Sequence, residues 1–140
     1  MRWMLLILPL WLLGAPCTKC QLNKDQMRCE YYVAKKGDAS KAHFCKSYAD
    51  YLNDTKVYGK AAWYYLLAKE PQKAVEASQK ALELGEAYAK EYMAFGYWLL
   101  GKKAKAKTAL QGFEANDLTK KDKAIIQKLY NTKINLKELQ

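Results

Sequence analysis

The sequence has little of what most catalytic sites are built from. It holds a single histidine, His43, and it has no Gly-rich phosphate-binding loop, no metal-spaced cluster of His, Asp and Glu, and no paired-carboxylate motif. No Ser or Cys nucleophile is placed to use His43 as a base, so a surface or packed histidine is the simpler interpretation. We therefore expect neither an enzyme nor a bound metal or cofactor.

Proline and glycine are also scarce. Only three prolines and seven glycines occur in 140 residues, while 51% of the residues are apolar. This composition is typical of an ordered, mainly helical chain and argues against disorder. The length allows one ordinary domain with a single hydrophobic core.

Acidic residues are outnumbered by basic ones. The chain has 24 Lys and Arg against 14 Asp and Glu, which gives a formal charge of +10. Such a charge attracts acidic proteins, anionic membrane surfaces or nucleic acid. The lysines are spread along the chain rather than clustered, however, so a solvated Lys-rich exterior explains them equally well.

The longest apolar run is short. It covers eleven residues, 3–13, directly after Met1 and Arg2. As a helix it would rise only about 16 Å, too little for a hydrocarbon core of roughly 30 Å. It is typical of a secretory signal, with Ala15-Pro16-Cys17 as a cleavage site before Thr18. We expect a signal peptide over residues 1–17 and export to the periplasm or medium; an uncleaved membrane anchor, lipidation and a plain buried helix are the alternatives.

Four cysteines lie in the first third of the chain, and two of them are placed symmetrically. Cys29 and Cys45 each lie eight residues from Gly37, which with Asp38 reads as a helix stop followed by an N-cap. Residues equidistant from the turn face each other in an antiparallel helix pair, which favours a Cys29–Cys45 disulfide. Such a bond would contribute on the order of 3 kcal/mol. Two buried thiols are the alternative.

The other two cysteines form a C-x-x-C motif, Cys17-Thr18-Lys19-Cys20. This spacing occurs in redox centres and metal sites. No strand–helix pattern of a thioredoxin-like unit follows, and Gln21 stands where a haem-attachment motif needs His. Cleavage after Cys17 would leave Cys20 unpaired, whereas earlier cleavage would allow two disulfides of open connectivity.

An internal repeat organises residues 60–113. Small residues recur 32 positions apart, and bulky residues recur with them. A period in this range indicates stacked supersecondary units. The small pairs are Ala62/Ala94 and Ala74/Ala106, with Ala42 extending the register, and the bulky pairs are Trp63/Phe95, Tyr65/Tyr97 and Leu67/Leu99.

The same register predicts the helices. Turns are expected at Gly37, Lys69 and Gly101, again 32 apart. The final helix is predicted from Thr119, with Asp122 completing a capping box, as an amphipathic lid over the last pair. The other helices are expected at residues 23–36, 39–53, 56–68, 71–84, 86–100 and 102–113, where Pro71 suits a first helical position and Gly85 a helix stop.

This pattern resembles the tetratricopeptide repeat family. The second unit carries the resemblance in Ala62, Tyr65, Ala74 and Ala81-Leu82, and the third in Ala94, Tyr97, Gly101, Ala106 and Leu110. The period is 32 where the family has 34 residues, so one turn would be shortened. The resemblance implies an all-α, right-handed solenoid of about three antiparallel helix hairpins over residues 18–116, plus a C-terminal capping helix over residues 117–140.

The resemblance also implies a concave binding surface. The family's groove positions place Tyr31, Trp63 and Phe95 in one column. An aromatic column beside lysines would hold an extended or helical peptide, although aromatic residues at this spacing are often core. The flanking residues would be Lys35, Lys56, Lys60, Tyr88, Glu91, Trp98 and Leu99.

These observations together favour an exported, non-enzymatic protein that binds another protein or peptide and serves as a scaffold in the cell envelope. An acidic partner fits the charge, nucleic acid is not expected, and the membrane is reached only through an uncleaved N-terminus. The alternative is a thiol–disulfide or metal-handling protein that uses the C-x-x-C motif. The sequence leaves the partner and the oligomeric state open.

Overall fold

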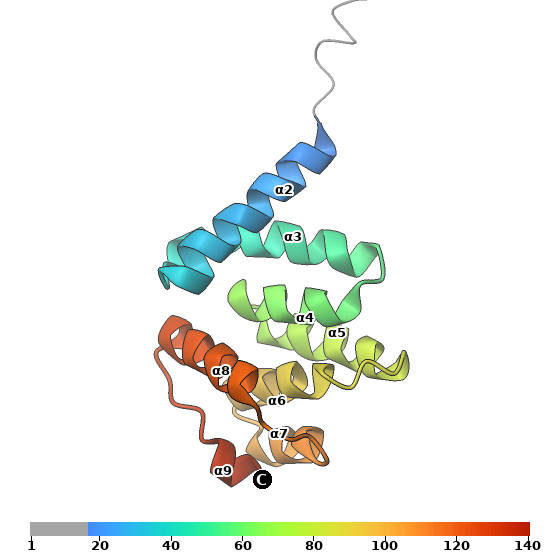
Figure 1. Ribbon diagram of the computed structural model, residues 1–140, viewed down its shortest axis with the longest axis vertical. Helices are drawn as coiled ribbons and strands as arrows, with labels where there is room; N and C mark the ends of the chain where they lie inside the picture. The colour runs from blue at the N-terminus through green and yellow to red at the C-terminus, as the bar shows by residue number, and fades with distance from the viewer. Residues whose placement is uncertain (1–16) are drawn as a thin grey trace, which may run out of the picture.

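The computed structural model describes residues 17–140, and within that range the chain is helical with no strand (Figure 1). The predicted all-α class is confirmed. The predicted signal peptide lies outside the described residues except for Cys17. None of the helices in residues 17–140 is both long and apolar enough to span a membrane.

The helices follow one another with short connections. A π-helical segment, η2, continues the first helix, and a short 3₁₀ turn, η3, precedes the second. In chain order the elements are α2 (Thr18–Arg28), η2 (Cys29–Lys35), η3 (Ala39–Lys41), α3 (Ala42–Asp54), α4 (Tyr58–Leu67), α5 (Pro71–Glu83), α6 (Ala89–Leu99), α7 (Lys103–Leu110), α8 (Asp117–Tyr130) and α9 (Leu136–Leu139).

From α2 to α7, each helix packs against the next one along the chain. In Figure 1 they form successive layers, with α3 above α4 and α5 and with α6 and α7 below them. In addition, α4 packs against α6, so the first helix of the α4–α5 pair lies beside the first helix of the α6–α7 pair. This contact brings together the side chains on their shared face.

The turns lie where the repeat register puts them. Gly37, Lys69 and Gly101 have positive φ angles of 72°, 59° and 76°. This left-handed conformation reverses the chain after a helix, and it suits glycine because it has no Cβ. Two helix starts also match the sequence: Pro71 is the first residue of α5, and the Asp38 carboxylate accepts a bond from the Ser40 amide at 3.0 Å.

Alanines hold neighbouring helices close together. Ala62, Ala74, Ala94 and Ala106, which define the repeat, are all fully buried. Large side chains fill the space between the pairs, among them Leu66, Leu67 and Phe95. Burial of this apolar surface is the main stabilising contribution to the fold.

The buried disulfide joins the two helices of the first pair. Cys29 in η2 is bonded to Cys45 in α3, with 4.8 Å between their Cα atoms, and both residues are fully buried. This is the pairing that the symmetric spacing about Gly37 favours. A second disulfide joins Cys17 and Cys20 at the start of α2, and no cysteine in residues 17–140 is free.

The last long helix does not lie where a lid over the third pair would lie. Instead, α8 packs against η2 and α4, while the short α9 packs against α7. Residues 111–116 carry the chain back from the end of α7 to the start of α8. The apolar side chains Ile126 and Leu129 of α8 are buried there in the common core.

Candidate functional site

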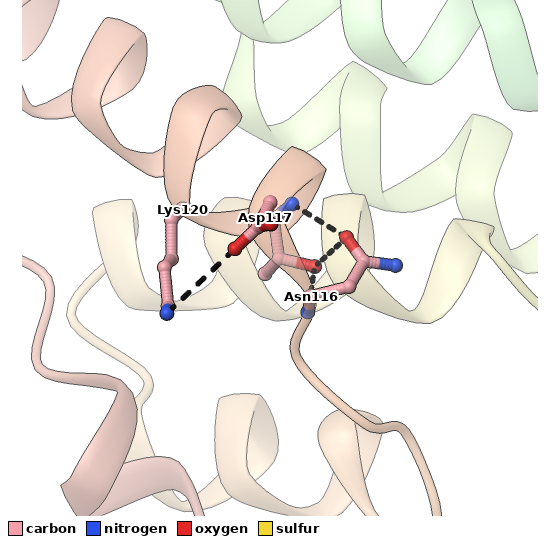
Figure 2. Close-up of polar contacts among 4 residues, drawn as sticks. Asn116, Asp117 and Lys120 are labelled. Carbon is pink, nitrogen blue, oxygen red and sulfur yellow. Dashed lines mark hydrogen bonds and ion pairs between the residues drawn. The ribbon is translucent and has the colours of Figure 1, made fainter.

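The start of α8 is fixed by a capping box. The N-cap is Asn116, whose side-chain oxygen accepts a bond of 3.0 Å from the Thr119 amide, and the Thr119 hydroxyl accepts one of 3.2 Å from the Asn116 amide (Figure 2). Lys120 and Asp117 form an exposed ion pair of 3.9 Å beside it. The predicted box of Thr119 with Asp122 is therefore wrong by three residues, and Asp122 is available for another contact.

A groove runs between η2 and α8. It encloses about 470 Å³ and is lined by Glu30, Ala34, Lys35, Lys121, Ala124 and Ile125. Its apolar surface comes from the two alanines and Ile125, and its lysines stand on opposite walls. Lys35 was predicted from the sequence as a binding residue. Its ammonium group lies 5.7 Å from the ring centre of Tyr31, another predicted binding residue, whose side chain is 48% exposed.

Glu30, the one acidic residue that lines this groove, is already hydrogen-bonded within the protein. A carboxylate oxygen of Glu30 accepts a hydrogen bond of 2.5 Å from the Tyr64 hydroxyl of α4. That hydroxyl in turn accepts a bond of 3.3 Å from the Gln26 side chain. Burial and the bond to Glu30 raise the pKa of Tyr64, so the phenol stays a donor at ordinary pH. The chain of bonds fixes η2 against α4 and leaves the two lysines to dominate the groove.

An aromatic patch lies between α4 and α6. The rings of Trp63 and Tyr92 have centres 5.5 Å apart, and Tyr88 meets Tyr92 edge-on at 6.0 Å. Tyr88 is 44% exposed, so the patch reaches solvent. Two of the predicted binding residues, Trp63 and Tyr88, therefore do come together, and exposed Lys60 lies three residues before Trp63 on α4.

The other predicted binding residues are placed differently. Phe95 is fully buried, so it belongs to the core and is not part of a binding surface. Its position on the inner face of α6, against the alanines of the repeat, explains this. Trp98 is partly buried, with the Lys103 ammonium 4.7 Å from its ring centre. Lys56 is exposed in the link before α4. Tyr31, Trp63 and Phe95 thus do not form one exposed column.

Two carboxyl side chains meet under the start of α8. Glu91 of α6 and Asp122 of α8 are only 5% and 7% exposed, and one oxygen of Glu91 has no hydrogen-bond donor. Burial and the neighbouring Asp122 raise the pKa of Glu91 to about 8. Burial also raises the pKa of Asp122. Such a pair holds a proton at neutral pH.

A second hollow, of about 320 Å³, lies among α3, α4 and α5. Charged groups of both signs line it, including Asp50, Lys73 and Lys80. The Asp50 carboxylate accepts a bond of 2.6 Å from Tyr65 and pairs with Lys46 at 3.4 Å. We therefore interpret it as a structural joint between the first and second helix pairs.

The exposed C-x-x-C motif begins α2. Cys17 is the N-cap, and its sulfur accepts a bond of 3.2 Å from the Cys20 amide. Both residues are exposed, in contrast to Cys29 and Cys45. Residues 17–140 contain no group of three or more His, Cys, Asp or Glu side chains placed to hold a metal ion.

Sequence reasoning missed the α8 wall of the groove and the carboxyl pair. A usable signal was present for the pair. Asp122 stands four and seven residues before the buried Ile126 and Leu129, and Glu91 stands three and four residues before the buried Ala94 and Phe95. A charged residue in line with an apolar helix face indicates a buried charge that needs a partner.

We compared the chain with protein-family models, with curated proteins and with solved structures, and none of these comparisons produced a match.

Proposed function

We propose that this protein is an exported, non-enzymatic scaffold of the cell envelope that binds an acidic segment of another protein. The helix pairs would act as tetratricopeptide-like units in a short right-handed solenoid, capped by the chain's own C-terminal helices. The observation that carries the proposal is the groove between η2 and α8, with an apolar floor and a lysine on each wall.

The groove suits a peptide that combines one apolar side chain with acidic neighbours. Ala34, Ala124 and Ile125 leave room for an apolar anchor, whose burial would supply affinity. Lys35 and Lys121 stand beside it and are exposed, so they would pair with carboxylates and speed the encounter. The formal charge of +10 acts in the same direction.

A fluorescein-labelled peptide of alternating Glu and Leu provides a defined probe. We expect it to bind the protein in a fluorescence anisotropy titration, and the Lys35→Glu/Lys121→Glu variant to bind at least tenfold more weakly. The matched control is Lys80→Glu/Lys107→Glu, which reverses two exposed charges on α5 and α7. Its net charge equals that of the groove variant, so it isolates the groove from the overall charge.

The same pair of variants tests the proposal in cells of the source organism. A photo-reactive amino acid at Ile125 should cross-link to one envelope protein, and the groove variant should abolish that product while the control variant keeps it. Equal peptide binding by both double variants would rule out the groove. Cross-linking at exposed Leu118 instead of Ile125 would place the interface at the start of α8, away from the groove.

Export is supported by the buried Cys29–Cys45 disulfide. Disulfides persist in oxidising compartments and are rare in the cytosol. The apolar run at residues 3–13 has the length of a secretory signal. The intact mass of the mature protein tests both points: a start at Thr18 with one disulfide supports signal cleavage, and a start at Met1 supports a membrane anchor.

The exposed disulfide favours thiol–disulfide exchange as a second candidate function. A partner thiolate would attack one sulfur, break the Cys17–Cys20 bond and form a mixed disulfide. The partner's second thiol would then close its own disulfide, and the two protons of the partner's thiols would end on Cys17 and Cys20. The position of Cys17 at a helix start, where the helix dipole stabilises a thiolate, is consistent with this.

Graded glutathione redox buffers test this candidate. Alkylation followed by mass spectrometry should find Cys17 and Cys20 reduced under conditions in which Cys29 and Cys45 remain bonded. Reduction of both pairs over the same range would argue against it. A mature N-terminus at Thr18 would exclude it, because Cys17 would be removed with the signal.

A further inference from the structure

The Glu91 side chain of α6 and the Asp122 side chain of α8 contact each other directly. Both are more than nine-tenths buried, and they lie 31 positions apart in the chain, in α6 (Ala89–Leu99) and α8 (Asp117–Tyr130). One oxygen of Glu91 has no donor among the described residues. Two ionised carboxylates can only accept hydrogen bonds, so they cannot satisfy each other.

A single proton resolves this arrangement. When one of the two groups is protonated, it becomes a donor and the other carboxylate accepts, so the contact changes from repulsion to a charge-assisted hydrogen bond. The Thr119 hydroxyl also lies beside Glu91, but it donates its proton to the Asn116 side-chain oxygen at 3.2 Å. The same proton is not needed when α8 leaves η2 and α4, because water then solvates both carboxylates.

We propose that docking of α8 on η2 and α4, which buries the Glu91–Asp122 pair, takes up a proton at that pair, so that the pair is a latch which tightens in acid and loosens as pH rises. The latch follows from the contact of the two side chains. Burial and Asp122 raise the pKa of Glu91 to about 8, which places the response in the physiological range.

Few other ionisable groups of residues 17–140 lie around the pair. Burial raises the pKa of Asp122, and the hydrogen bond to Glu91 and the neighbouring Lys121 of α8 act in the opposite direction. Tyr92 of α6 faces both carboxyls. Beyond it lie Tyr88, which directly precedes α6, and Tyr64 of α4. The pKa of each of these three phenols is raised, so they stay neutral over the range in which the carboxyls titrate.

The latch controls the groove between η2 and α8. Lys121 is the neighbour of Asp122, and Ala124 and Ile125 lie within one helical turn of it, so the α8 wall of the groove is held by the same contact. Loosening α8 would separate this wall from η2. This consequence rests on the proposed function, and it predicts that the groove binds its acidic segment best below neutral pH and releases it as pH rises.

Hydrogen–deuterium exchange on the whole protein, without any ligand, tests the latch. Exchange times are scaled at each pH for the chemical exchange rate. We expect the opening of α8 peptides to rise by up to tenfold per pH unit from pH 5 to pH 8 and to level off above it, because the closed form keeps a proton that the open form loses. Peptides of α5 should show no such rise.

The Glu91→Gln/Asp122→Asn variant is the matched control. It keeps the shape of both side chains and replaces the shared proton with amide donors, so α8 should exchange equally at every pH. A flat wild-type profile, or an unchanged slope in the variant, would overturn the latch. A side-chain carboxyl resonance of Glu91 that titrates near its ordinary pKa would do so as well, and it requires no variant.

The binding consequence is tested separately. The labelled Glu-Leu peptide should bind wild-type protein more weakly at pH 8 than at pH 6, and the variant should lose this difference. If α8 exchange responds to pH while the peptide fails to bind at any pH, the latch stands and the groove proposal fails. If peptide binding is found without a pH response in α8, the latch fails and the groove stands.

Discussion

The phenol end of Tyr88 lies where a Cβ atom on Gly59 would be. A methyl group added at residue 59 would collide with the hydroxyl oxygen and the ring of that tyrosine. Tyr88 precedes α6 and Gly59 belongs to α4, so this contact seats the aromatic patch of Trp63 and Tyr92 between the two helices. A small residue in α4 is therefore what allows the hydroxyl end of Tyr88 to come this close to the helix.

Gly59→Ala should displace the ring without unfolding the protein. Tyr88 is 44% exposed and can swing outward, and alanine favours a helix by about 1 kcal/mol over glycine, which offsets the lost contact. We expect a change in Trp63 fluorescence and little change in the urea midpoint. Gly96→Ala provides the contrast, because its Cβ would meet Val75 and the backbone of Pro71. It should destabilise the fold by about 1–3 kcal/mol, and an equal effect of the two variants would contradict this difference.

Tyr130→Phe should loosen the C-terminal half of α8. The Tyr130 hydroxyl donates a bond of 2.6 Å to the carbonyl oxygen of Leu66, in the last turn of α4. Its loss leaves that carbonyl with one bond fewer, which costs about 0.5–1.5 kcal/mol. Urea unfolding measures the change, and Tyr51→Phe, on an exposed ring, is the control. Equal stability of the two variants would show that the hydrogen bond contributes nothing.

Glu91→Gln should alter how stability depends on pH. Because the pKa of Glu91 is raised to about 8 in the folded protein, its favourable contribution is complete below pH 4.5 and is lost as pH rises to 8, by at most about 1.4 kcal/mol per pH unit. The variant removes this loss. Its free energy of unfolding, followed by urea titration, should exceed that of wild type above pH 7 and fall below or equal it near pH 4. Parallel curves would disprove the assignment.

Removal of the buried disulfide should cost far more than removal of the exposed one. Cys29→Ala/Cys45→Ala releases the two helices of the first pair, and closure of a loop of this size is worth about 3 kcal/mol. Cys17→Ser/Cys20→Ser removes a disulfide between residues only three positions apart, at the exposed start of α2. This variant should change the unfolding midpoint little. Thermal denaturation without reductant compares them. Similar midpoints would mean that the first pair is held by packing alone.

Local signals in the sequence predicted the local structure well. The repeat register located the turns at Gly37, Lys69 and Gly101 because a helix that reverses needs a residue in a left-handed conformation. The symmetric spacing of Cys29 and Cys45 about the Gly37 turn fitted their pairing, because residues equidistant from the turn face each other in an antiparallel helix pair. Helix ends were less accurate: α7 stops at Leu110, since Gln111 already has an extended ψ of 130°.

Long-range placement was not predictable in the same way. The apolar face of α8 indicates that the helix packs against something, but not which surface it meets. It returns to η2 and α4 through residues 111–116, and this also determines the groove and the partner of Asp122. Phe95 shows the converse case, because an aromatic residue at a groove position of a repeat is buried once the neighbouring pair is in place.

The return of α8 changes how the molecule should come apart. In an open stack each unit touches only its neighbours, so the ends fray independently and unfolding proceeds unit by unit. Here a helix from the end of the chain ties η2 to α4, so residues more than sixty positions apart depend on each other, as Tyr130 and Leu66 do. We therefore expect a single cooperative unfolding transition, and slower folding than the local helices alone would give.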